Sequence, residues 1–149
     1  MTIMGIARFE RFFQAVAELD VHKNDLKRYS DFINHNLYDL LLMAEATAHA
    51  NDRDVLQPED LPITKGLQQT IREFAKLDEG LELEPIIEQL EMLPPLDLAY
   101  GDDVRAELPF VAGGLSVAFA RALKIIDPTL RAPHSEQWNR VFRLFDLLL

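Results

Sequence analysis

Carboxylate and imidazole side chains recur at helical spacing in one stretch of the sequence. Asp31, His35 and Asp39 stand four residues apart, so an α-helix would place all three on one face. Such groups bind divalent metals. A line of three along a single helix is a poor metal cage, however, and charged steps of this kind are typical of a solvated face. The same holds for Glu45 and His49. We therefore expect neither a metal site nor a cofactor.

Residues that could form a covalent or phosphate-binding site lack the surroundings that such sites need. Ser30, Ser116 and Ser135 do not stand in the glycine-flanked turn that activates a nucleophilic serine. The adjacent Gly113 and Gly114 lie inside a helical pattern and not in a phosphate-binding loop. We expect no catalytic residue and no enzymatic activity, and a metal-dependent enzyme using the Asp31 face is the least favoured alternative.

The composition limits the classes of protein to which the chain can belong. Its 149 residues contain no cysteine, which excludes disulfides and thiolate metal sites. The N-terminal stretch lacks the apolar core of a signal peptide. The longest run without a charge, residues 108–120, is shorter than the roughly 20 residues that a membrane span needs. We expect a soluble, cytoplasmic protein without membrane association.

The formal net charge of −10 argues against a general polyanion binder, because phosphate neutralisation requires an excess of Lys and Arg on some surface. This net charge does not exclude a local basic patch.

Apolar residues recur at steps of three and four, and no stretch shows the alternation of a strand, so we predict an all-α protein. The first half of the chain predicts a short helix over 5–18 and a long helix over 24–51, which Asn24 could cap. Pro58 then suits the first position of a further helix that Pro62 interrupts and that ends near residue 77.

The second half repeats this order after a linker near Gly80. A short helix is expected around 86–93, a second long helix over 102–126 with Asp102 as its N-cap, and a closing helix from Ser135. The pattern short–long–short therefore occurs twice, and we divide a single domain, 1–149, into a first unit, 1–78, and a second unit, 79–149.

A short helix, a long helix, the loop "RDVLQPEDL" and another short helix together resemble the histone fold. The loop is similar to the second-loop motif of archaeal histones. The stretches "LDVHKNDLKRYSDF" and "PEDLPITKGLQQT" resemble a small family of bacterial and archaeal proteins with two histone folds in one chain, whose function is not established.

This resemblance implies that Arg53 and Asp60 form a salt bridge across the loop. It also implies association with DNA, although Val55 replaces a threonine that contacts DNA in archaeal histones. Two units in one chain would form an intramolecular handshake, a pseudo-dimer in which the two long helices cross.

Two glycines in a helix interior cost about 1 kcal/mol each relative to alanine, so Gly113 and Gly114 need a compensating reason. They lie at the midpoint of the second long helix, and we expect Leu37 and Tyr38 of the first long helix to pack against them. The alternative is a local kink caused by Pro109 together with the glycines.

Antiparallel long helices would bring the loops together in pairs. Loops 19–24 and 127–133 would form a basic end, and loops 51–57 and 94–101 an acidic end. The basic end would be mildly basic and would contain Lys23, Lys27, Arg28, Lys124 and Arg131, against Asp20, Asp25 and Asp127. The acidic end would contain Asp52, Asp54, Asp97, Asp102 and Asp103, against Arg53 and Arg105.

Two functions stay open. The basic end could bind duplex DNA weakly and without sequence preference, through phosphate contacts. Alternatively, the protein is an interaction module that binds another protein and no nucleic acid, in which case the charges at the two ends are ordinary surface scatter. We expect a monomer or a weak homo-oligomer.

Overall fold

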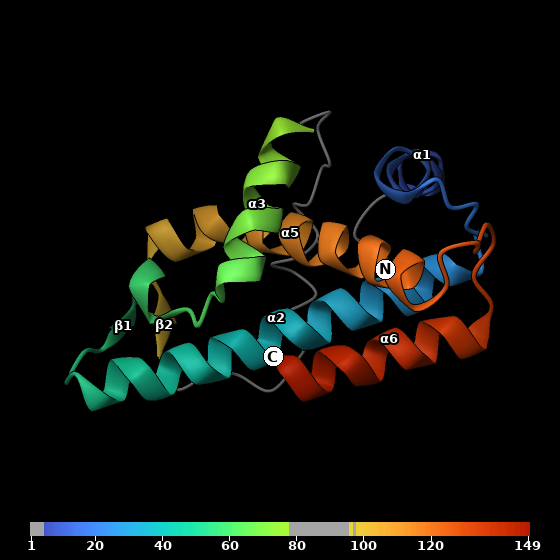
Figure 1. The fold of residues 1–149 in the computed structure, drawn as a ribbon. Coiled ribbons are helices and arrows are strands. Elements are labelled where there is room, and N and C mark those ends of the chain that lie inside the picture. Colours follow the sequence, from blue (N-terminus) through green and yellow to red (C-terminus); the bar gives the residue numbers. More distant parts are fainter. Residues whose placement is uncertain (1–4, 78–95, 97) are drawn as a thin grey trace.

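The computed structural model describes residues 5–77, 96 and 98–149 and is mostly helical, which confirms the all-α prediction (Figure 1). The elements are α1 (Ile6–Ala17), α2 (Asp25–Ala50), β1 (Val55–Leu56), the 3-10 helix η1 (Pro58–Asp60), α3 (Lys65–Lys76), β2 (Ala99–Tyr100), α5 (Asp102–Ile126) and α6 (Ser135–Leu148). The helix expected around 86–93, the linker near Gly80 and Asp97 lie outside the described residues.

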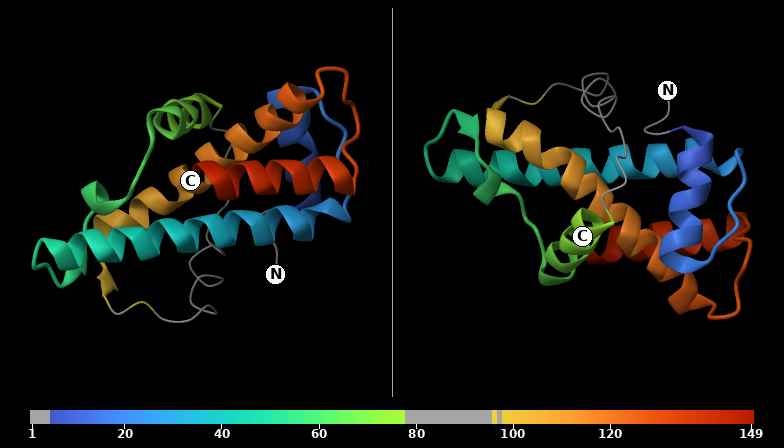
Figure 2. Two further views of the ribbon diagram at one scale, coloured as in Figure 1. Left: turned by 60° about the horizontal axis from the view of Figure 1, so that its bottom comes forward. Right: turned by 90° about the horizontal axis from the view of Figure 1, so that it is seen from above.

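The two long helices, α2 and α5, run antiparallel and cross (Figure 2). Near the start of α2 the Tyr29 hydroxyl hydrogen-bonds to Ser116 Oγ of α5 at 2.5 Å, and Ser116 Oγ in turn donates to the Ala112 carbonyl at 2.7 Å. This contact is buried, and it ties together helices that lie far apart in the sequence. Burial raises the pKa of the Tyr29 hydroxyl well above its ordinary value, so the group stays protonated.

Both halves of the chain contribute to one core. Phe13 of α1 packs edge-on against Tyr29 of α2, and it also contacts Phe119 of α5 and Trp138 of α6. All four side chains are fully buried, and Phe119 stacks on Trp138 with ring centroids 4.9 Å apart. Aromatic pairs of this geometry add about 1 kcal/mol each beyond their buried area. The stability of either half therefore depends on the other.

Gly113 and Gly114 of α5 pack against a different helix from the one that we expected. A Cβ on Gly113 would overlap the ring of Phe74, and a Cβ on Gly114 would lie 2.5 Å from Ile71 Cγ1. Both neighbours belong to α3, so the prediction that Leu37 and Tyr38 fill this space is wrong. Close approach of another helix does explain the glycines, and the helix that approaches is the short one.

A parallel strand pair joins the two halves at the end of α2. Val55 pairs with Ala99 and Leu56 with Tyr100. Gly101 then follows so closely that a Cβ there would lie 2.9 Å from the Leu56 carbonyl oxygen. No strand was predicted from the sequence, because a two-residue strand is too short to show alternation.

The structure also differs from the sequence-based predictions at three helix starts. Gly101, and not Asp102, is the N-cap of α5, while Asp102 lies in its first turn. Pro58 begins a single 3-10 turn and not an α-helix. Asn24 occupies the N-cap of α2, but its side chain makes no capping hydrogen bond.

Helix α5 is long and apolar enough, by length and composition alone, to cross a membrane. In the folded chain it is the central core helix, and 56% of its most apolar window is buried inside the protein.

Candidate functional site

The basic end, which we define by loops 19–24 and 127–133, has the two loops in direct contact. The Asp20 amide donates to the Arg131 carbonyl at 2.6 Å. Leu19 and Val21 on one loop and Leu130 on the other are buried and anchor the loops to the core. The hydrogen bond and the buried residues fix the backbone of both loops, so the charged side chains that the loops carry project from the same end of the molecule.

The sequence-predicted cations, Lys23, Lys27, Arg28, Lys124 and Arg131, all belong to these loops or to the adjoining turns of α2 and α5. Lys23, Lys27 and Arg131 are exposed, and Arg28 and Lys124 are partly buried. Lys27 forms an exposed ion pair with Asp31 at 2.7 Å. Among described carboxylates, none forms an ion pair with the other four cations, which leaves them available to phosphates.

Two acidic side chains at this end are engaged in local hydrogen bonds. Asp25 accepts from the His22 amide at 3.1 Å, and Asp127 accepts from the amide of Thr129 at 3.2 Å and its hydroxyl at 3.0 Å. Helices α2 and α6 begin at this end, but α1 and α5 end here, so the partial charges of the helix termini oppose one another. The hydrogen bonds hold the two carboxylates against the backbone of the loops.

At the opposite end, Arg53 and Asp60 form the expected pair. Arg53 Nη1 donates to Asp60 Oδ2 at 2.7 Å, and Arg53 Nη2 bonds to Asp60 Oδ1, so the contact is bidentate. The Gln57 amide also donates to Asp60 Oδ2 at 2.9 Å. Asp60 is buried, whereas the Arg53 side chain is 31% exposed. The pair closes the loop that carries β1 and η1 onto the end of α2.

The same contact shifts both pKa values. The hydrogen bond from Arg53 holds the pKa of the Asp60 carboxyl below its ordinary value, and the bond to Asp60 raises the pKa of Arg53. Both residues are therefore charged at neutral pH, and Arg53 is already occupied by a structural partner.

The remaining charges around β1 and β2 are mainly acidic. Asp52 and Asp54 precede β1, and Asp102 and Asp103 follow β2, all four being exposed. Arg105 lies over the Tyr100 ring at 5.4 Å from its centroid. This end is unsuited to a polyanion.

The Asp31, His35 and Asp39 face has the solvated character that its spacing indicated. Asp31 pairs with Lys27, and His35 Nε2 lies 3.3 Å from Asp39 Oδ2, with all of these side chains exposed. Within residues 5–77, 96 and 98–149, no group of three His, Asp or Glu side chains could hold a metal ion.

An exposed apolar surface on α6 and the middle of α2, which we call the leucine surface, was not predicted from the sequence. Leu147 and Leu148 are 80% and 72% exposed, and Met43 of α2 is 59% exposed. Met43 and Leu148 line the same hollow. The closing "FDLLL" carries apolar residues on several sides of α6, and this was the available signal.

Comparison with known proteins gives a family without an assigned role. A family model described as a domain of unknown function, DUF1931, matches residues 9–146. One uncharacterised protein from Aquifex aeolicus (strain VF5) is 28% identical over 138 residues, with 83% of this chain and 80% of the relative covered. A second from the same organism is 25% identical over 120 residues, with 80% and 70% covered.

Two crystal structures are similar over nearly their whole length. One, of a protein from Thermus thermophilus, is 53% identical with a TM-score of 0.94 over 99% of both chains. The other, from Aquifex aeolicus, is 24% identical with a TM-score of 0.85 over 99% of this chain and 97% of that one. At that identity the second likeness shows the fold alone.

Proposed function

The chain belongs to the DUF1931 family of unknown function, and from this premise we propose that it is a double histone-fold protein whose basic end binds duplex DNA. Two antiparallel long helices in one chain, with their loops paired at both ends, support the handshake. The main chain hydrogen bond between Asp20 and Arg131 carries the functional part of the proposal, because it fixes cations from both units on one surface.

The expected mode of binding is weak, without sequence preference and limited to the phosphate backbone. Lysine and arginine contacts to phosphate position a protein on DNA but read no bases. The net charge of −10 opposes approach from most directions, so encounter should favour orientations that present the basic end. The acidic end contributes little, because Arg53 is held by Asp60 and Val55 offers no hydroxyl.

A duplex-retardation titration of the full chain at two salt concentrations tests this function. We expect retardation at low salt and a fall in affinity with a log–log slope of about −3, which corresponds to roughly three phosphate contacts. The triple variant Lys23→Glu, Lys27→Glu and Arg28→Glu should abolish binding, because it reverses the charge on one of the two paired loops.

A second triple variant controls for net charge. Lys65→Glu, Arg72→Glu and Arg143→Glu introduce the same change on exposed positions of α3 and α6, and binding should persist. If both triple variants lose DNA binding, the binding depends on the net charge of the whole protein and not on the basic end. Absence of retardation by the wild type at low salt would exclude the DNA function.

The leucine surface favours a second candidate, a protein-interaction module that binds no nucleic acid. Contiguous exposed apolar patches on soluble proteins commonly mark contact surfaces for other proteins. Here the exposed Leu148 of α6 and Met43 of α2 line the same hollow. This candidate becomes the better account if the wild type fails to retard DNA.

A further inference from the structure

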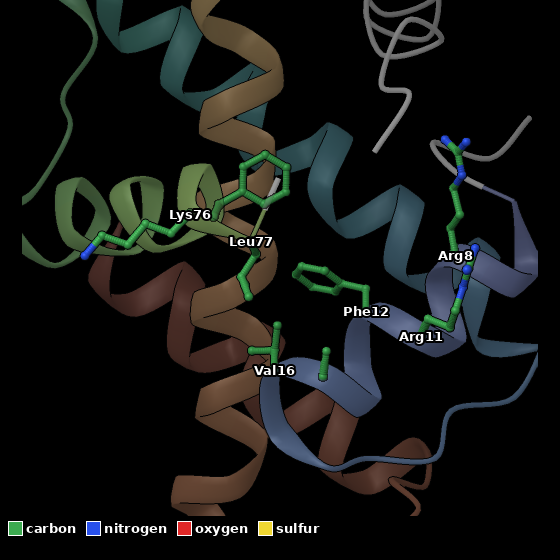
Figure 3. A pocket seen from close by; sticks show the side chains of 8 residues that line it. Arg8, Arg11, Phe12, Val16, Lys76 and Leu77 are labelled. Atoms are coloured by element: carbon green, nitrogen blue, oxygen red, sulfur yellow. The ribbon is translucent and has the colours of Figure 1, made fainter. Parts of the chain in front are cut away.

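A hollow of about 470 Å³ lies between α1 and the end of α3 (Figure 3). Its volume falls in the range of roughly 300–1,000 Å³ that small-molecule sites occupy. The described residues that line it are Arg8, Arg11, Phe12, Ala15, Val16, Phe74, Lys76 and Leu77. It is separate from the surface assigned above to DNA, so the inference drawn from it does not depend on that function.

The hollow combines an apolar floor with basic side chains. Phe12 and Val16 point toward Leu77, which is 40% exposed and borders open space. Arg8 and Arg11 lie together on one side, one helical turn apart, and Lys76 extends away on the other side. Every charged residue among the described lining residues is basic, although the chain as a whole has a net charge of −10.

We propose that this hollow binds a small anionic amphiphile, with a carboxylate or phosphate head at Arg8 and Arg11 and an apolar tail against Phe12, Val16 and Leu77. Arginine is suited to such a head because its planar guanidinium matches both anions in geometry. A tail would remove the exposed face of Leu77 from water. A polyanion such as DNA would leave that apolar floor uncovered, so the lining selects a ligand with both characters.

Calorimetric titration of the full chain with decanoate tests the site. We expect saturable binding at a single site, weaker binding of the neutral analogue decanol and no binding of decyltrimethylammonium. Arg11→Glu should lower the affinity for decanoate about tenfold, since it replaces one exposed attraction with a repulsion. Raising the salt concentration should weaken decanoate binding and leave decanol binding unchanged.

Filling the hollow is an independent test. Ala15→Trp places a large side chain at its exposed edge and should abolish decanoate binding. Arg140→Glu, at an exposed position of α6, is the charge-reversal control for Arg11→Glu, and it should leave the affinity for decanoate unchanged. If Ala15→Trp fails to fold, Leu77→Gln replaces it: this change makes part of the apolar floor polar at an exposed residue just beyond α3, and it should weaken decanoate binding.

Three results would each overturn the proposal. The first is the absence of saturable decanoate binding, including the case in which an acidic helical peptide binds and decanoate does not. The second is equal affinity for decanoate and decanol. The third is an affinity for decanoate that is unchanged both by Arg11→Glu and by Ala15→Trp or, where that variant does not fold, by Leu77→Gln.

Discussion

Replacing Asp60 with alanine is expected to lower the free energy of unfolding by about 3 kcal/mol, because removing one partner of a buried ion pair strands the other. Asp60 is 2% exposed and accepts hydrogen bonds from Arg53 and from the Gln57 amide. The expected loss is at the low end for such pairs, since Arg53 is 31% exposed and can turn toward water. Urea denaturation of the wild type and the variant measures the difference.

A double-mutant cycle shows whether the pair itself is responsible. Arg53→Ala leaves Asp60 buried without its cation, so it should destabilise the protein more than Asp60→Ala does. The double variant should lose much less than the two single losses together, because neither charge is then stranded. If the single effects simply add, Arg53 and Asp60 do not interact energetically, and the loop is held by its other contacts.

The contribution of Asp60 to the free energy of unfolding should decrease as the pH is lowered. The pKa of Asp60 is lower in the folded chain than in the unfolded chain, so its charge stabilises the fold above the unfolded value of about 4. This contribution is lost as the pH falls through the lower, folded pKa. The stability difference between wild type and Asp60→Asn should therefore be constant from about pH 5 to 8 and narrow below about pH 4. A gap that widens on acidification would contradict the assignment.

Gly114→Ala is expected to cost about 2 kcal/mol, although alanine normally stabilises a helix interior by about 1 kcal/mol relative to glycine. The new Cβ would lie 2.5 Å from Ile71 Cγ1, 3.0 Å from the Ile71 amide nitrogen and 3.1 Å from its Cα. A side chain can change rotamer, but the backbone of α3 can relieve this overlap only by moving the whole helix. Thermal and urea unfolding measure the loss.

Two further glycines provide matched controls. Gly66→Ala is the same chemical change on α3 with no heavy atom within 4 Å, and it should be neutral or stabilising by less than about 1 kcal/mol. Gly113→Ala would place its Cβ in overlap with Cγ and Cδ2 of Phe74, a second residue of α3, so it should be destabilising as Gly114→Ala is. A Gly114→Ala variant as stable as Gly66→Ala would show that α3 does not pack closely at this point.

The sequence by itself determined the helical elements and the order of their lengths. Apolar periodicity located α2 and α5 to within a residue or two, because a long helix with one buried face repeats its pattern over many turns. The pairing of the loops at both ends was predicted from the resemblance to the histone fold, in which antiparallel long helices bring the loop before one to the loop after the other. The Arg53–Asp60 pair came instead from the resemblance of the loop to a known motif.

The tertiary structure alone decided which surfaces meet. Gly113 and Gly114 indicated a close approach, but a glycine carries no side chain that could indicate its partner, and only the fold showed that α3 occupies the space. The β1–β2 pair is too short to have a period. The hollow beside Arg8 and Leu77 arises from helices separated by the whole of α2. Local patterns determine which face of a helix is buried, whereas the identity of its neighbour depends on how the entire chain packs.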